Sequence, residues 1–166
     1  MRAADTQGTP PTTHLFVYGT LRRGGSNDIA RIAPAASFVT FARVRGCLYD
    51  VNGRWPSLVL DDAANWVSGE IYAVPPPAWP ALDALEDPVT PARPDGAYFK
   101  VTARAEITAS AAGEHTGAHT GEQTSDAAQE AMDVTLYTAN PATTPLTRLI
   151  ASGDWLAYAR LLALRT

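Results

Sequence analysis

The most informative segment of the sequence is Leu15-Phe16-Val17-Tyr18-Gly19-Thr20-Leu21-Arg22-Arg23-Gly24-Gly25. Its first four residues form an apolar run of β-formers that is short enough for a buried strand. Gly19 then permits a sharp exit from the strand or the close approach of a ligand to the backbone. Successive backbone N–H groups in such a turn can hold a carboxylate or a phosphate. The segment therefore predicts a buried strand that leads into an anion-binding loop.

The same loop has simpler interpretations. It also fits an ordinary strand-to-loop turn, with Arg22 and Arg23 exposed to solvent. If the two guanidinium groups faced a ligand instead, they would add positive charge for a phosphate. The loop is not a P-loop, because the lysine and the glycine spacing of that motif are missing. A backbone nest, an ordinary turn and an arginine-assisted phosphate site are all compatible with these residues.

A carboxylate on the apolar face of a short helix is predicted in Leu82-Asp83-Ala84-Leu85-Glu86. Three prolines before this segment suit the approach to a helix, and Pro88 ends the pattern. At about 100° per residue, with Trp79 at zero, Leu82 lies at roughly 300° and Glu86 at roughly 340°. Glu86 therefore falls between Trp79 and Leu82, inside an apolar stripe that Leu85 extends at roughly 240°.

Glu86 is the candidate general base. A carboxylate that faces the core is desolvated, and desolvation raises its pKa. Its position in the last helical turn, where the macrodipole disfavours an anion, shifts the pKa in the same direction. A carboxyl group shifted in this way titrates nearer to neutral pH, where a general base works best. The alternative is that Glu86 curls into solvent or pairs with an arginine.

The rest of the sequence predicts several strands and few helices. Strands are expected over residues 38–50, 55–60, 67–74, 98–107 and 134–138, with a hairpin turn at Asn52-Gly53. Short helices are expected over residues 27–33 and 152–164. The pattern predicts an α+β fold, namely a small mixed β-barrel with a few short flanking helices.

Two segments differ in composition from this domain. Residues 1–13 are polar and contain a glycine and two prolines, so a disordered N-terminal tail is expected. Residues 108–131 are rich in Ala, Gly, Thr and acidic residues, which predicts a low-complexity, mobile insertion between two paired strands. Residues 14–166 are expected to form one domain that carries this insertion. His115 and His119 have a metal-ligand spacing, but the neighbouring glycines disfavour the helix it requires, so no metal site is predicted.

The composition fits a compact cytoplasmic enzyme. A chain of 166 residues suffices for one domain with a core, and contents of 46% hydrophobic and 18% charged residues are ordinary. The net charge of −4 argues against a nucleic-acid partner, and four acidic residues of the insertion account for all of it. The sequence has neither a signal peptide nor an apolar run of membrane-spanning length, and its single cysteine excludes an intrachain disulfide. The expected partner is therefore a small molecule, and neither a nucleic acid nor a membrane.

Several short motifs follow one another along the chain. In order, they are Val17-Tyr18-Gly19-Thr20-Leu21-Arg22-Arg23-Gly24 with Asn27, Gly46-Cys47-Leu48-Tyr49-Asp50, Trp55-Pro56-Ser57-Leu58-Val59, Val67-Ser68-Gly69-Glu70-Ile71-Tyr72, Leu82-Asp83-Ala84-Leu85-Glu86, and Ser152-Gly153-Asp154-Trp155. This ordered set resembles the γ-glutamylcyclotransferase-like family, which includes AIG2-like proteins and γ-glutamylamine cyclotransferases. The chain departs from the family's pattern where Asp87-Pro88 follows the glutamate and where Lys100 takes the place of an arginine.

The resemblance implies a barrel fold and an intramolecular amidocyclase. In this reaction the α-amine of a γ-glutamyl amine or γ-glutamyl amino acid attacks its own γ-carbonyl, which gives 5-oxoproline and a free amine. Glu86 would be the general acid/base, and backbone N–H groups would hold the α-carboxylate or the developing oxyanion. The substrate-binding residues would be Tyr18, Gly19, Thr20, Leu21 and Tyr98. Such a C–N-cleaving cyclotransferase would need no metal or organic cofactor.

Two other functions fit the same sequence. The main alternative is a non-catalytic domain on this fold that binds a small anion or has a regulatory role, because a fold does not fix a function. The other is a phosphate-ligand binder that uses Arg22 and Arg23. A cyclotransferase requires the Glu86 carboxylate to face the backbone of residues 19–21 across an open cavity.

Overall fold

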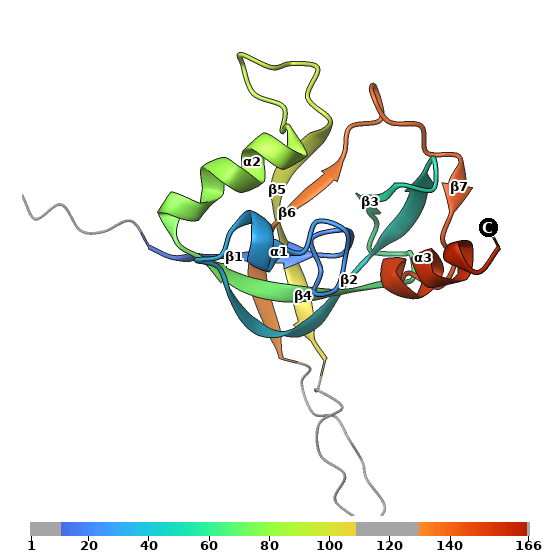
Figure 1. Cartoon of the computed structure of the whole chain (residues 1–166), viewed down its shortest axis with the longest axis horizontal. Helices are drawn as coiled ribbons and strands as arrows, with labels where there is room; N and C mark the ends of the chain where they lie inside the picture. The colour runs from blue at the N-terminus through green and yellow to red at the C-terminus, as the bar shows by residue number, and fades with distance from the viewer. Residues whose placement is uncertain (1–10, 109–129, 166) are drawn as a thin grey trace, which may run out of the picture.

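The computed structural model describes residues 11–108 and 130–165. Its elements, in chain order, are β1 (Thr13–Val17), α1 (Ile29–Ile32), β2 (Ser37–Val51), β3 (Trp55–Leu60), β4 (Trp66–Val74), the 3₁₀ turn η1 (Pro76–Ala78), α2 (Trp79–Glu86), β5 (Tyr98–Ile107), β6 (Ala131–Ala139), β7 (Arg148–Leu149) and α3 (Trp155–Ala163). Strands predominate, and the helices lie around them (Figure 1).

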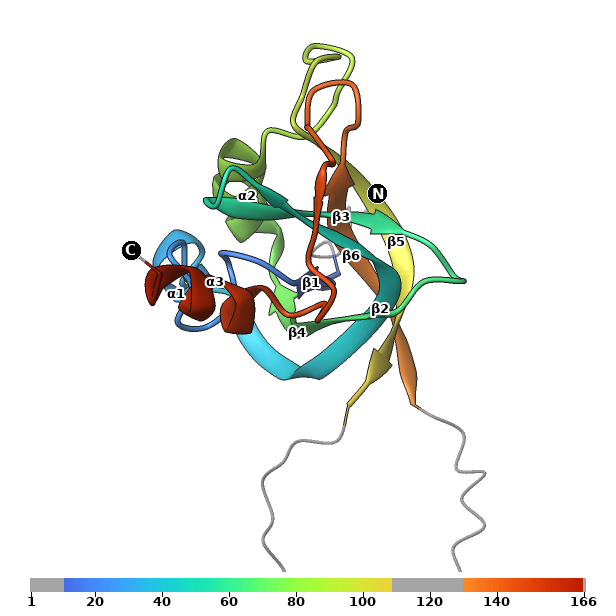
Figure 2. The same ribbon diagram turned by 90° about the vertical axis from the view of Figure 1, so that its right-hand side faces the viewer.

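Five strands close into a mixed barrel. Their order is β2-β4-β1-β6-β5, and β5 pairs with β2 through Ala42 and Arg43, which closes the ring. β1 and β6 are parallel, whereas the other neighbouring strands in the ring are antiparallel. The predicted α+β fold with a small mixed barrel is confirmed. The side view in Figure 2 shows the sheet curling around on itself.

The long strand β2 belongs to two pairings. Its first part pairs with β4 as far as Arg45, and its second part pairs with β3 from Gly46 onward. A side chain at Gly46 would clash, because its Cβ would lie 2.6 Å from the carbonyl oxygen of Val59. The predicted hairpin turn after β2 is confirmed, with φ of 57° at Asn52 and 70° at Gly53. This hairpin carries Trp55 and the residue after it to the mouth of the barrel.

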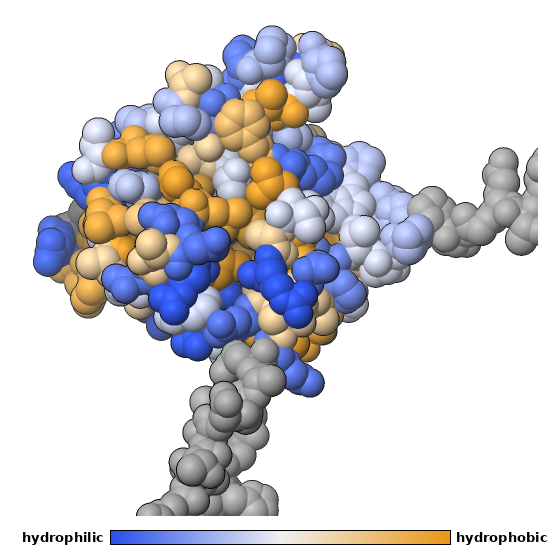
Figure 3. Space-filling view, turned by 180° about the vertical axis from the view of Figure 1, so that it is seen from behind, coloured by the Kyte–Doolittle hydropathy of each residue, from blue (hydrophilic) through white to orange (hydrophobic). Residues whose placement is uncertain are grey.

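The core has two parts that share β1. Phe16 packs with residues such as Val44 and Leu136 in one cluster. Leu15 and Val17 point the other way and pack with residues of α1 and α2 in a second cluster. β1 is therefore buried on both faces, as its continuous apolar run predicted. Seen from behind, the surface shows small groups of hydrophobic side chains separated by hydrophilic ones (Figure 3).

Several element boundaries differ from the sequence prediction. α1 has only four residues, and α3 begins at Trp155, where the Asp154 side chain caps it by accepting from the Ala157 N–H. The two-residue strand β7 was not predicted, because so short an element has no periodicity to detect. No helix in the described part of the chain is long and apolar enough to cross a membrane.

The two segments of unusual composition lie mostly outside the description. The expected tail, residues 1–13, overlaps β1 at Thr13, and residues 1–10 are outside the described residues. Most of the expected insertion, residues 109–129, is also outside them, together with His115 and His119. β6 begins at Ala131, the last residue of the expected insertion, and β5 and β6 are paired in register from Tyr98 with Ala139 to Glu106 with Ala131. The two strands that precede and follow residues 109–129 are therefore neighbours in the barrel.

Candidate active site

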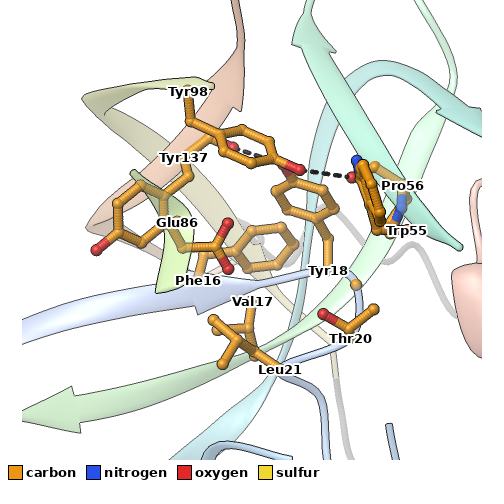
Figure 4. Close-up of a pocket in the computed structure, with 11 residues that line it drawn as sticks. Phe16, Val17, Tyr18, Thr20, Leu21, Trp55, Pro56, Glu86, Tyr98 and Tyr137 are labelled. Atoms are coloured by element: carbon orange, nitrogen blue, oxygen red, sulfur yellow. Dashed lines mark hydrogen bonds between the residues drawn. The ribbon is translucent and has the colours of Figure 1, made fainter. Parts of the chain in front are cut away.

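A cavity at the end of β1 brings together all six residues predicted from the sequence. They are Tyr18, Gly19, Thr20, Leu21, Glu86 and Tyr98, and the other lining residues are Phe16, Val17, Trp55, Pro56 and Tyr137. The cavity contains about 350 Å³ of empty space, part of which is open to solvent. Figure 4 shows the Glu86 carboxylate pointing into the space between the tyrosine rings and the loop after β1.

The helix that carries Glu86 is anchored on both sides. Leu82 is fully buried in the second core cluster. Asp83 accepts hydrogen bonds from the Tyr137 hydroxyl at 2.7 Å and from Lys100 Nζ at 3.0 Å. Lys100 also lies 3.9 Å from the centre of the Trp79 ring. Lys100 thus ties β5 to α2, and this arrangement holds the helix that carries Glu86 against the barrel.

The apolar stripe of α2 is narrower than the sequence predicted. Leu85 is 39% exposed rather than part of the buried face. The helix has only eight residues and is capped by Asp87, which has the left-handed φ of 48°. Because the helix is so short, fewer of its residues contact the core than the helical spacing predicted. Glu86 is the last residue of this helix, and its side chain lines the cavity.

The Glu86 side chain is half-buried at the cavity wall, and its carboxylate has no partner among the described residues. It has no hydrogen bond or salt bridge to any residue that the structure describes, which rules out the expected alternative of an arginine pair. Burial raises the pKa of Glu86 from 4.5 to about 7. A carboxyl group with this pKa exists in both protonation states near neutral pH, which is what proton exchange requires.

The tyrosines around Glu86 use their hydroxyl groups elsewhere. The Tyr18 hydroxyl donates to the backbone carbonyl of Tyr137 at 2.6 Å, and the Tyr98 hydroxyl donates to the carbonyl of Pro56 at 3.3 Å. Burial and the nearby Glu86 raise the pKa of Tyr98 to about 12, so its hydroxyl stays protonated. The Tyr137 hydroxyl points away from the cavity, toward Asp83 (Figure 4). These rings shape the cavity and leave the carboxylate free for a ligand.

The first three residues of the loop after β1 use their carbonyl groups, but not their N–H groups, in hydrogen bonds within the described part of the chain. The carbonyls of Gly19, Thr20 and Leu21 accept from the N–H groups of Arg22, Asn27 and Ile29, at 3.1, 3.0 and 3.0 Å. The N–H groups of residues 19–21 have no hydrogen-bond partner among the described residues. Three successive free amides beside a cavity form the kind of nest that holds an anion.

Gly19 is required by the wall opposite the loop. A Cβ at this position would lie 2.6 Å from Cγ and 3.0 Å from Cδ of Pro56. The proline comes from β3, which the hairpin brings over the loop. Trp55 and Pro56 line the cavity although their sequence motif does not indicate it; the hairpin signal at residues 52–53 is the only local sign that they reach the site.

Replacing Gly19 with valine is expected to abolish the binding of an anionic ligand, so that a titration with a small carboxylate shows no saturation. The added side chain must displace either the Pro56 wall or the backbone nest, and such overpacking costs about 1–3 kcal/mol of stability. Gly24→Ala is the matched control in the same loop. It also introduces strain at a φ of 80°, but nothing lies within 4 Å of its Cβ. Similar losses of binding in both variants would contradict the nest.

Arg22 is buried, which contradicts the alternative in which both arginines are exposed to solvent. It is 8% exposed, and its guanidinium group lies 3.4 Å from Glu70 Oε1 and 3.1 Å from Asp154 Oδ1. Arg22 does not line the cavity, and the Arg23 guanidinium stacks 4.8 Å from the centre of the Phe38 ring. A phosphate site built on these two arginines therefore loses its support. Periodicity gave no indication of this burial, because the partners lie far along the chain.

A larger, outer chamber continues from the cavity. It shares Thr20, Trp55, Glu86 and Tyr98 with the inner cavity and contains about 1160 Å³ of empty space, much of it open to solvent. Its remaining lining comes from four loops or element ends: Asn27, Val51, Asn52, Leu85, Asp87, Asp95, Ala97, Thr143, Thr144 and Pro145. Glu86 stands at the boundary between a narrow inner space and a wide outer one.

Known proteins resemble this chain in sequence and in fold. Residues 15–157 match the model of the family described as "Gamma-glutamyl cyclotransferase, AIG2-like". Among proteins with curated annotation, none matches significantly. In the described part of the chain, no group of three His, Cys, Asp or Glu side chains is placed to hold a metal ion.

Solved structures share the fold at low sequence identity. YkqA from Bacillus subtilis has a TM-score of 0.61 and 20% identity over 93% of this chain, which spans 43% of that protein. An AIG2-like protein from Mus musculus has a TM-score of 0.54 and 21% identity, with coverage of 82% of this chain and 86% of that one. A protein titled gamma-glutamyl cyclotransferase has a TM-score of 0.51 and 13% identity, with coverage of 78% and 67%.

Proposed function

The chain belongs to the γ-glutamyl cyclotransferase, AIG2-like family, and we propose that it cyclises a γ-glutamyl amide to 5-oxoproline with Glu86 as the general acid/base. Family and fold together indicate γ-glutamyl cyclotransferase-like activity. The observation that carries the specific proposal is the pairing of two unsatisfied groups across one cavity. These are the Glu86 carboxylate and the N–H groups of residues 19–21, none of which has a hydrogen-bond partner within residues 11–108 and 130–165.

The free amides support a site for the substrate's negative charge. The α-carboxylate of the glutamyl group would bind to the N–H groups of Gly19, Thr20 and Leu21, which are oriented before any ligand arrives. The rings of Tyr18 and Tyr98 would enclose the carbon chain and keep it folded. Because the ring closure is intramolecular, most of the catalytic benefit would come from holding this reactive conformer.

Glu86 would move protons between the two nitrogens of the substrate. The α-ammonium group is not a nucleophile, so the ionised carboxylate first takes a proton from it. The free amine attacks the γ-carbonyl carbon, and a C–N bond forms. Protonated Glu86 then returns a proton to the leaving nitrogen as the old C–N bond breaks. Over the whole reaction two protons pass from the α-nitrogen to the departing amine, and no metal or organic cofactor takes part in these steps.

The outer chamber supports an exit for the amine. Glu86 lines both spaces, so a γ-carbonyl held beside it would direct its nitrogen substituent outward. The glutamyl group would fill the narrow inner cavity, while the wide chamber would accommodate amines of different size.

Release of 5-oxoproline from a panel of γ-glutamyl compounds tests the proposal. The panel contains γ-glutamyl amines and γ-glutamyl amino acids, and both products are quantified. We expect equimolar 5-oxoproline and amine from at least one member. Binding of γ-glutamyl compounds without any product would instead support the non-catalytic alternative.

The acid limb of the pH–rate profile is expected to report Glu86. The base works only when ionised, and burial raises its pKa to about 7, so kcat/KM falls as the pH drops through this value. Below it, the rate should decline about tenfold per pH unit, and above it the limb should level off. Steady-state rates between pH 4 and 8 provide the measurement. A limb that levels off near pH 4.5 would show that an unshifted carboxylate, and not Glu86 in this cavity, controls the rate.

A further inference from the structure

The arginine that follows the three free amides is held by two carboxylates from distant parts of the chain. Arg22 Nε lies 3.4 Å from Glu70 Oε1 on β4, and Arg22 Nη1 lies 3.1 Å from Asp154 Oδ1 before α3. The Arg22 side chain is 10% exposed and that of Glu70 is 3% exposed. The loop is thereby fixed at the residue where its turn closes, since the Arg22 N–H donates to the Gly19 carbonyl.

Glu70 holds the loop at a second point. Its Oε2 atom accepts from the backbone N–H of Arg23 at 3.0 Å and from the Tyr72 hydroxyl at 2.9 Å. Glu70 itself is fixed in the sheet, where it is paired with Val17 at the end of β1. One buried carboxylate therefore connects the side chain of Arg22 and the backbone of Arg23 to the barrel wall.

Asp154 connects the same loop to the last helix. Its Oδ1 atom accepts from the Ala157 N–H at 3.2 Å, which caps α3, as well as from Arg22. The preceding residue is held against β4, because the Ser68 N–H donates to the Gly153 carbonyl at 2.9 Å. Gly153 has a φ of 66°, and its Cβ would clash with the carbonyl oxygen of Trp66, so no other residue fits there.

We propose that Glu70 is a positioning residue that keeps the N–H groups of residues 19–21 converged on the cavity by holding Arg22 and Arg23. The inference rests on the proposed function, in which these amides bind the substrate's carboxylate. Neither Glu70 nor Arg22 lines the cavity, so neither touches the substrate. The two carboxylates offset the guanidinium charge, and anion binding is left to the backbone amides.

A positioning role predicts a defect in binding rather than in proton transfer. Glu70→Gln keeps the shape of the side chain and one acceptor oxygen but removes the charge that pairs with Arg22. We expect KM to rise at least tenfold, kcat to change less than threefold, and the acid limb of the pH profile to stay near pH 7. A loss in kcat with an unchanged KM, or a displaced acid limb, would overturn the proposal.

A direct readout comes from the amide signals of the loop. Titrating the ¹⁵N-labelled protein with L-5-oxoproline should shift the signals of residues 19–21 in the parent. In Glu70→Gln the same signals should already differ without ligand, and the dissociation constant should rise at least tenfold. Unchanged loop signals and an unchanged dissociation constant would overturn the proposal.

Two further variants separate positioning from stability. Tyr72→Phe removes only one hydrogen bond to Glu70 and should raise KM by two- to fivefold in the same direction, so it decides the matter if Glu70→Gln fails to fold. Val44→Ala weakens the core on β2 without touching the loop and should leave KM and the loop signals at parental values. If KM rose equally in Val44→Ala and Tyr72→Phe, lowered stability alone would explain the effect, and the proposal would be overturned.

The two proposals fail in distinguishable ways. If the parent turns over no γ-glutamyl compound but its loop amides bind L-5-oxoproline, the cyclotransferase proposal fails, while the titration of Glu70→Gln still decides the positioning role. If the parent shows turnover and Glu70→Gln leaves KM and the loop signals unchanged, the positioning role alone is overturned. If the parent amides do not respond to the anion at all, the positioning role is overturned as well.

Discussion

Glu86→Gln is expected to lower kcat by at least about 100-fold while substrate binding persists, which is the lower range for the loss of a general base. Glutamine fills the same space but can neither accept the proton of the α-ammonium group nor return it to the leaving nitrogen. The carboxylate has no partner among the described residues, so the substitution breaks no hydrogen bond or ion pair there. The variant is therefore expected to lose proton transfer while it keeps the parental fold.

The same variant should be at least as stable as the parent above pH 7. Burial raises the pKa of Glu86 from 4.5 to about 7, so the folded state holds a proton that the unfolded state releases between these values. The contribution of Glu86 to stability is thus complete below about pH 4.5 and is lost as the pH rises to about 7, a difference of about 3 kcal/mol. Glutamine has no proton to lose and removes this pH dependence.

Turnover and thermal unfolding should be measured on the same preparations. Glu106→Gln is the matched control, since Glu106 lies on β5 in a half-exposed pair with Arg43 and does not line the cavity. It should retain parental turnover. Retained turnover in Glu86→Gln would eliminate Glu86 as the base, and a melting temperature that falls steeply would indicate a structural carboxylate instead.

Local patterns predicted the loop after β1 and the position of Glu86 on α2, but not the contacts with distant residues that support them. The apolar run at residues 15–18 and the glycine after it are local signals, and they identified a buried strand with a loop whose amides are free. Helical spacing likewise placed Glu86 near the buried Leu82, on the side of α2 that faces the cavity. Both signals depend on neighbours within a few residues, which is the range over which sequence periodicity carries information.

The remaining features depend on contacts between distant segments. Arg22 was expected in solvent because no residue near it in the sequence can pair with it in a buried position. Its partners are 48 and 132 residues away, and only closure of the barrel and docking of α3 bring them together. The wall formed by Pro56 has a similar origin, because it depends on the length of β2 and on the hairpin that follows.

Arg22→Ala is expected to destabilise the protein by about 3–5 kcal/mol, the range for breaking a buried ion pair on one side only. The alanine leaves the Glu70 carboxylate 3% exposed with no cation beside it, and it also removes a contact from Asp154 at the cap of α3. Arg104→Ala provides the contrast, because Arg104 and Asp133 are 67% and 74% exposed and such surface pairs contribute about 0–1 kcal/mol.

The double variant Arg22→Met/Glu70→Leu makes this result interpretable. Replacing both charges of a buried pair with apolar groups of similar volume is often neutral, so the double variant should recover much of the stability that Arg22→Ala loses. Its loop would nevertheless lack the contact to the Arg23 N–H, so its KM should stay high while its unfolding midpoint in urea returns toward that of the parent. Recovery of both quantities together would mean that any well-packed support is sufficient for the loop, whereas recovery of stability alone would separate the strength of the fold from the geometry of the site.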